Sequence, residues 1–168
     1  MNGMAFEELS STAREFVVGH TQLLLESHRR LVGRDLLRTS SEPEAAAQAL
    51  FEAPFAVLSG GTEADQILNY GNDCALKLWG MNWEELTCMP SRLTAEPELR
   101  EARAALLERV RRDGYISDYR GVRIAKNGTR FYIENAVVWN LLDRDGVYCG
   151  QAATFAKWTD ALHSVRGC

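Results

Sequence analysis

The stretch Tyr70-Gly-Asn-Asp-Cys-Ala-Leu-Lys-Leu-Trp-Gly80 carries the strongest fold signal in the sequence. Residues 67–70 form a short apolar run that is typical of a strand. Asn72 has a side chain suited to capping a helix over residues 73–79, and Gly80 is suited to ending that helix. Asn82-x-x-Glu85 then resembles a capping box that opens another helical turn. We therefore predict a strand followed at once by two short capped helices.

Upstream of this stretch, the chain changes from helical periodicity to strand-like runs. Apolar residues recur at three- and four-residue steps from Phe6 to Leu36, with Gly19 and Gly33 as weak points. Ser41-x-x-Glu44 resembles a capping box with Pro43 inside the first turn, and it predicts a short helix over 45–51 that stops before Pro54. The run 55–58, ended by Ser59-Gly-Gly61, predicts the first strand.

Downstream, a longer helix is predicted over 97–112, with Pro97 as its first residue and Gly114 at its end. In this helix we expect Leu99, Ala102, Leu106 and Val110 to form the buried stripe. We expect the arginines to be more exposed: Arg103, Arg109 and Arg111.

Three strands are predicted over 115–125, 131–142 and 147–158. Asn127-Gly128 and Asp145-Gly146 are hairpin signals that join them into an antiparallel meander. The whole order predicts an α+β fold with a five-stranded antiparallel sheet and flanking helices. We divide the chain into an N-terminal helical extension (1–43) and a sheet core (44–168) within one structural domain.

Composition excludes several classes of protein. The chain has 168 residues, a formal net charge of −4 and 46% hydrophobic residues, which is ordinary for one globular domain. A mildly acidic chain is not expected to bind nucleic acid or an anionic membrane. The first eleven residues are too polar for a signal peptide, and no apolar run approaches membrane-spanning length. We therefore expect a cytoplasmic protein with reduced cysteines.

Several phrases of the sequence resemble a known family. The segment from Tyr70 to Gly80 with Trp83-Glu-Glu-Leu86 is similar to a phrase common in PAS domains. A closer resemblance is to the MEKHLA domain family, a PAS-related group, although the hexapeptide behind that name does not occur here. The matching segments are 27–34, 67–72, 119–124, 136–141 and 150–155. The resemblance covers roughly residues 20 to 158, and it implies a PAS-like fold and a sensory or ligand-binding role.

Metal and cofactor binding have little support in the sequence. His20 and His28 are about 12 Å apart along a helix, so they cannot share one metal ion directly. Haem-binding PAS domains use a histidine of the long helix, and residues 97–112 contain none. Flavin-binding light sensors use a cysteine in an Asn-Cys-Arg-Phe phrase, which neither Cys74 nor Cys88 matches. We predict no metal and leave any cofactor unknown.

Enzymatic activity is not expected. No nucleophile motif such as G-x-S-x-G occurs. The adjacent pairs Glu7-Glu8 and Glu84-Glu85 point about 100° apart on a helix, so they do not form an acid–base pair. We predict no catalytic residues.

The remaining possibility is a ligand pocket between sheet and helices, lined by polar residues that stand among apolar ones. The candidates are Asn69, Tyr70, Asn72, Tyr119, Arg123, Asn135, Trp139, Asn140 and Gln151. Tyr119 and Arg123 are expected on one strand face, where they could bind an anionic or polar ligand. The alternative places Arg123 outside, paired with a carboxylate such as Glu134.

Three of these candidates have alternative readings. Gln151 matches in position a strand glutamine that transmits ligand state in PAS-like light sensors, or it satisfies backbone groups. Asn72 is also explained as a helix cap, and Trp139 as a core residue.

Two functions follow. The first is a sensory or small-ligand-binding domain that signals by protein association, with an unknown partner protein. The second is a ligand-free dimerisation module with a filled core. In both, the front helix over residues 5–37 is the expected homodimer interface.

Overall fold

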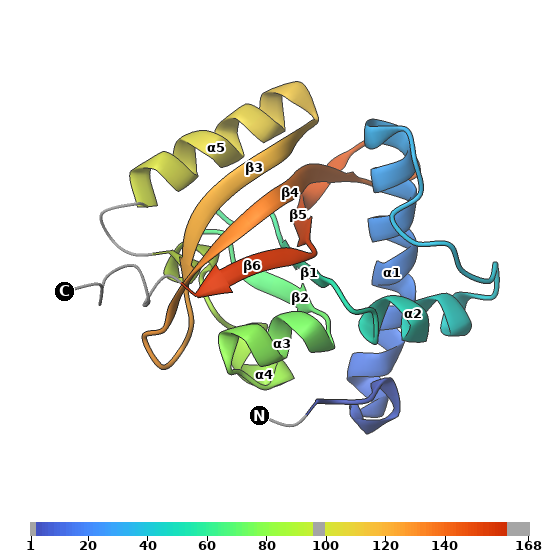
Figure 1. Ribbon diagram of the computed structural model, residues 1–168. Coiled ribbons are helices and arrows are strands. Elements are labelled where there is room, and N and C mark those ends of the chain that lie inside the picture. Colours follow the sequence, from blue (N-terminus) through green and yellow to red (C-terminus); the bar gives the residue numbers. More distant parts are fainter. Residues whose placement is uncertain (1–2, 96–99, 161–168) are drawn as a thin grey trace.

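The computed structural model describes residues 3–95 and 100–160. Figure 1 shows one sheet with helices around it. In chain order the elements are η1 (Phe6–Glu8), α1 (Ser11–Val32), α2 (Pro43–Phe51), β1 (Ala56–Gly60), β2 (Leu68–Gly71), α3 (Asp73–Trp79), α4 (Trp83–Leu86), η2 (Ser91–Thr94), α5 (Arg100–Asp113), β3 (Tyr115–Ile124), β4 (Arg130–Leu142), β5 (Tyr148–Phe155) and β6 (Lys157–Asp160).

The sheet is antiparallel and has the strand order β2-β1-β5-β4-β3, with β6 paired to β4. The predicted α+β fold is confirmed. The predicted last strand is divided at Ala156, so the described sheet has six strands where five were expected. β5 pairs only with the second half of β4, over 137–142, and this leaves an open edge along residues 131–134. β6 pairs with that edge, which satisfies its backbone groups.

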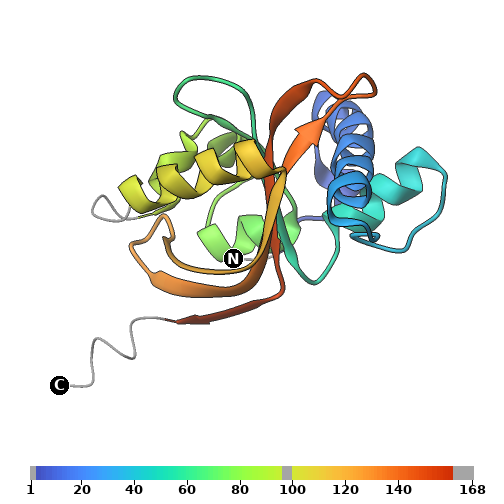
Figure 2. The same ribbon diagram turned by 90° about the horizontal axis from the view of Figure 1, so that it is seen from above.

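Helices cover both faces of the sheet (Figure 2). α1 and α2 pack on one face, which we call the outer face, and α5 packs on the other, the inner face, together with α3. Successive side chains of a strand point to opposite faces. Val57, Ser59 and Trp139 therefore face α1, whereas Leu58, Val138 and Ala153 face α5.

α1 is a regular capped helix packed on its own sheet. Ser10 Oγ accepts a hydrogen bond from Ala13 N, and Gly33 ends the helix in the left-handed conformation at φ 85°. Its buried residues are Val17, His20, Thr21, Leu24, Ser27 and His28. The predicted apolar stripe thus contacts the outer face of the same chain.

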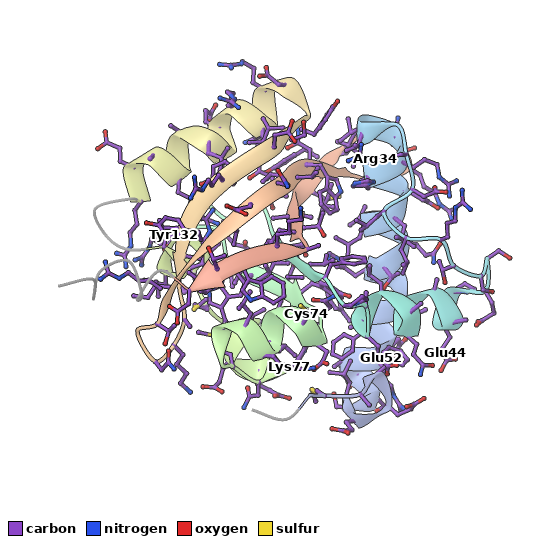
Figure 3. All side chains as sticks on the ribbon, in the orientation of Figure 1. Arg34, Glu44, Glu52, Cys74, Lys77 and Tyr132 are labelled. Atoms are coloured by element: carbon purple, nitrogen blue, oxygen red, sulfur yellow. The ribbon has the colours of Figure 1, made fainter. Side chains whose placement is uncertain are left out.

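The predicted cap of α2 was wrong by one residue. Glu42 caps the helix, because its carboxylate accepts hydrogen bonds from the backbone amides of Glu44 and Ala45. Ser41 was the expected cap. Glu52, just after α2, accepts a hydrogen bond from Phe6 N at 2.9 Å and so holds the start of the chain (Figure 3).

The caps predicted around α3 and α4 are confirmed. Asn72 Oδ1 accepts a hydrogen bond from Ala75 N, and Gly80 ends α3 at φ 70°. Asn82 and Glu85 form the reciprocal bonds of a capping box at α4.

The predicted buried stripe of α5 is confirmed at Leu106 and Val110 and wrong at Ala102. Ala102 is exposed and Arg103 is partly buried, while Leu106, Leu107 and Val110 face the sheet. Arg103, Leu107 and Val110 follow the spacing of one helical face, with Arg103 one turn before Leu107. The expected positions Pro97 and Leu99 lie outside the described residues.

The β3–β4 ribbon is irregular at two residues with positive φ, Asp118 at 57° and Asn135 at 53°. The pairing shifts register between Ile116 and Gly121. Such bulges increase the local twist, and the ribbon curves around the end of α5. No helix within the described residues is long and apolar enough to cross a membrane.

Candidate functional site

A small cavity lies between the inner face of the sheet and α5. Its volume is about 60 Å³, which is room for only a few water molecules. Strands β1 to β5, α3, α5 and η2 contribute its walls. The lining residues are Leu58, Ser59, Gly60, Gln66, Leu68, Trp79, Thr94, Arg103, Leu106, Leu107, Tyr119, Arg123, Ile133, Val138, Gln151, Ala152, Ala153 and Phe155.

Two of the predicted residues meet on the β3 wall of this cavity. Arg123 Nη2 donates a hydrogen bond to the Tyr119 hydroxyl at 3.3 Å, and the guanidinium lies 5.5 Å from the Tyr119 ring centre. Arg123 Nη1 donates to Val122 O at 2.8 Å. Only 9% of Arg123 is exposed. Glu134 pairs with Arg120 instead, at 3.8 Å, so the alternative that placed Arg123 outside does not describe this structure.

A second arginine enters the cavity from α5. Arg103 Nη1 lies 3.4 Å from Ser91 Oγ, and Ser91 Oγ donates a hydrogen bond to Gln66 Oε1 at 2.8 Å. The Nε atom of Arg103 is shielded from solvent and has no hydrogen-bond partner. An N–H donor in that state costs free energy that a suitable acceptor would recover.

The two arginines give the cavity an uncompensated positive charge. Neither forms an ion pair with a carboxylate among residues 3–95 and 100–160. Burial and, to a lesser extent, the neighbouring charge of Arg123 together lower the pKa of Arg103 to about 10. Arg103 therefore still carries its charge at neutral pH.

Two amide side chains join the sheet to α5 beside the cavity. Gln151 Nε2 donates hydrogen bonds to Leu107 O at 2.8 Å and to Asn140 Oδ1 at 3.3 Å. Asn140 Nδ2 donates to Arg111 O at 3.2 Å. Both bonded carbonyls belong to α5, so this pair couples the position of the helix to strands β4 and β5.

Outside the cavity, an open groove runs between α5 and the 61–66 loop. Gln66, Arg103, Leu107 and Gln151 line both the groove and the cavity. These four residues therefore lie between the cavity and the groove.

Asn69 and Tyr70, two other predicted residues, lie on the α1 side of the sheet. His20 Nε2 is 2.7 Å from Ser59 Oγ, which donates to Asn69 Oδ1 at 2.6 Å. Tyr70 is fully buried between His20 and Trp83, its hydroxyl has no partner, and burial raises its pKa. Neither residue lines the cavity.

Three more predicted residues lie outside the cavity lining, as do Asn69, Tyr70 and Asn140. Asn72 Oδ1 accepts from Val57 N and Ala75 N, and its Nδ2 donates to two backbone carbonyls. Trp139 packs edge-on against His28, with ring centres 4.9 Å apart. Asn135 is exposed at the β4 bulge.

Sequence reasoning missed Arg103, Ser91 and Gln66. The signal for Arg103 was its position one helical turn before Leu107, on the face that continues to Val110. Ser91 and Gln66 lie in short connections with no periodicity, and only the folded chain brings them together.

The cavity does not have the size of a common cofactor site. Pockets for drug-sized ligands occupy about 300–1,000 Å³, so a flavin or haem ring would require α5 to move away from the sheet. No group of three or more His, Cys, Asp or Glu side chains in the described parts of the chain is arranged to hold a metal ion.

The strand order and the helices on the inner face define the chain as a PAS-like domain. A family model described as "MEKHLA domain" matches residues 18–160. The chain belongs to the MEKHLA domain family, as its sequence phrases predict. No curated protein matches the chain in sequence.

Solved structures share the fold at low sequence identity. A PAS domain from Colwellia psychrerythraea has a TM-score of 0.58 and 16% identity, covering 68% of this chain and 92% of that one. An RNA-binding light-oxygen-voltage receptor has a TM-score of 0.58 and 18% identity, covering 79% of this chain and 38% of that one. A light-oxygen-voltage domain studied with a flavin analogue has a TM-score of 0.55 and 16% identity, covering 68% and 83%.

Proposed function

We propose that this chain is a sensory domain that binds a small molecule in the cavity between the sheet and α5, and that it signals by protein association rather than by catalysis. The observation that carries the proposal is the buried polar wall of the cavity. Arg103, Arg123 and Tyr119 keep hydrogen-bonding capacity there that the described protein groups do not use. Buried polar groups are normally paired, and a ligand would supply the missing partners.

Occupancy of the cavity would be communicated through α5. A ligand beside Arg103 and Gln151 changes the distance at which α5 lies from the sheet, because Gln151 and Asn140 bind carbonyls of that helix. A ligand shifts a conformational equilibrium only by the difference in its affinity for the two states. Direct contact with both α5 and the sheet provides such a difference.

The test is a cavity-filling substitution. Ala153 lines the cavity, so Ala153→Leu should occlude it, whereas Ala102→Leu adds the same atoms to the exposed face of α5. Native mass spectrometry of gently purified protein should show a retained small molecule on the unaltered chain and on Ala102→Leu, and none on Ala153→Leu. A chain without bound ligand in all three samples, together with hydrogen exchange that does not differ among the three proteins, would count against the proposal.

A second candidate is a dimerisation module that holds no ligand. Its interface would have to use the exposed side of α1, where Phe16 is 42% exposed, because Val17 and Leu24 pack on the sheet of the same chain. A bare homodimer mass that a Phe16→Glu substitution converts to a monomer would favour this candidate. The free thiols of Cys74, Cys88 and Cys149 agree with the cytoplasmic location that we propose for either function.

A further inference from the structure

The lining of the cavity contains two arginines and no acidic residue among its described members. An isolated guanidinium is costly to bury unless a negative charge compensates it. Burial lowers the pKa of Arg103 most, and the neighbouring charge of Arg123 also lowers it, so repulsion between the two arginines adds to that cost. An anion between them would remove both penalties at once.

The hydrogen-bond donors of this wall are arranged for an acceptor. Arg103 Nε has no partner, Arg103 Nη1 makes only the long 3.4 Å contact with Ser91, and Arg123 is held in place through Val122 O and Tyr119. The Tyr119 hydroxyl accepts from Arg123, so its own hydrogen is free for another acceptor. Charge-assisted hydrogen bonds to a carboxylate are the strongest that such donors form.

Most of the remaining cavity lining is apolar, and its polar members are Ser59, Gln66, Thr94 and Gln151. Trp79 and Phe155 pack against each other with ring centres 6.1 Å apart, and aliphatic side chains complete the wall. These aliphatic residues are Leu58, Leu68, Leu106, Leu107, Ile133, Val138, Ala152 and Ala153. An inorganic anion has no group that uses this surface, whereas an organic acid has both a charged end and an apolar body.

We propose that the ligand is a small organic anion with a single carboxylate, bound by Arg103 and Arg123, with a short apolar body against Ile133, Val138 and Phe155. This inference rests on the proposed function, since it names the class of ligand for the same cavity. The volume of about 60 Å³ limits the body to a few carbon atoms unless α5 moves. Entry is through the groove at Gln66 and Leu107.

The experiment measures binding of acetate, propionate and butyrate by isothermal titration calorimetry at constant ionic strength. Butyramide, which has the shape of butyrate without its charge, and inorganic phosphate serve as comparison ligands. The variants are Arg103→Met and Arg123→Met, and Arg109→Met is the matched control because Arg109 is exposed on the same helix. Circular dichroism of each variant verifies that it is folded.

We expect at least one carboxylate to bind about tenfold or more tightly than butyramide. Arg103→Met and Arg123→Met should each weaken it by about tenfold or more, with Arg109→Met unchanged. If butyramide binds as tightly as the carboxylates and Ala153→Leu abolishes this binding, the ligand is not an anion, although the cavity remains the ligand site. Phosphate binding without carboxylate binding would overturn the organic body. If none of the carboxylates binds to the folded, unaltered chain, this inference is overturned. If native mass spectrometry then shows a different retained molecule, the proposed function still stands.

Discussion

His20 is enclosed between α1 and the sheet, with 8% of its surface exposed. Because Ser59 Oγ donates its hydrogen to Asn69, it accepts from His20 Nε2, which fixes the neutral tautomer protonated at Nε2. Desolvation lowers the pKa of His20 from 6.5 to about 4. The folded state therefore binds fewer protons than the unfolded state between these values, and stability is lost as pH falls through this window.

We predict that protonation of His20 lowers the free energy of unfolding by about 3 kcal/mol between pH 7 and pH 4. His20→Gln keeps a donor for Ser59 and should remove this part of the pH dependence. Urea denaturation at several pH values measures it. If the variant and the unaltered chain lose stability in parallel from pH 6.5 to 4.5, His20 is not the titrating group.

Arg103 is a charged residue that opposes folding of the unliganded domain. Its pKa is lowered to about 10, which means that the folded state disfavours the charged form. At neutral pH, Arg103→Met should raise the free energy of unfolding by about 1 kcal/mol, because it replaces a buried unpaired charge with an apolar chain of similar length. Thermal unfolding without added ligand tests this, and a lower melting temperature than that of Arg109→Met would contradict it.

At the scale of elements, Asn72 connects four parts of the chain. It caps α3 and also bonds the backbone of β1, of α2 and of the segment between them. Asn72→Ala should cost about 3 kcal/mol, since it leaves buried backbone groups unpaired. Asn82→Ala removes a cap at the exposed start of α4 and should cost only about 1 kcal/mol. Equal losses in chemical denaturation would show that Asn72 acts only as a cap.

Gly150 allows β5 to approach β1 closely. Its φ is 143°, and a Cβ atom there would lie 2.2 Å from Gly60 O. Because that contact is with backbone, we expect Gly150→Ala to destabilise the domain by about 3 kcal/mol or more. Gly19→Ala meets nothing within 4 Å in α1 and should stabilise the domain by up to about 1 kcal/mol. The unfolding midpoints of the two variants should shift in opposite directions from that of the unaltered chain. If Gly150→Ala leaves the midpoint unchanged, β5 can move away from β1.

At the scale of the molecule, the two faces of the sheet are covered with unequal strength. α1 has six buried residues, whereas α5 has one, Val110. α5 is held by a small apolar cluster with Ile116 and Val138 and by the bonds of Gln151 and Asn140. The side that carries the cavity is thus the weakly attached side, as a ligand site that opens requires.

We predict that the amides of α5 exchange at least about tenfold faster than those of α1 under native conditions. Gln151→Leu removes the bond to Leu107 O and should increase exchange in α5 without changing α1. A ligand that binds in the cavity should slow exchange in α5. Hydrogen exchange followed by mass spectrometry measures the difference between the helices, the effect of Gln151→Leu and the effect of the ligand. Equal protection of α1 and α5 would contradict the prediction.

The local signals of the sequence determined the element order, the caps at Asn72 and Asn82, the hairpins and the family. These depend on neighbours within about four residues, which the sequence displays directly. The even spacing of Tyr119 and Arg123 also indicated a shared strand face. Only the tertiary structure decided that Arg103 faces the sheet and that Asn69 and Tyr70 lie on the α1 side. It also decided that the last strand breaks at Ala156. The face that a side chain occupies depends on bulges, strand register and helix phase. These features are set by contacts between residues that are distant in the chain.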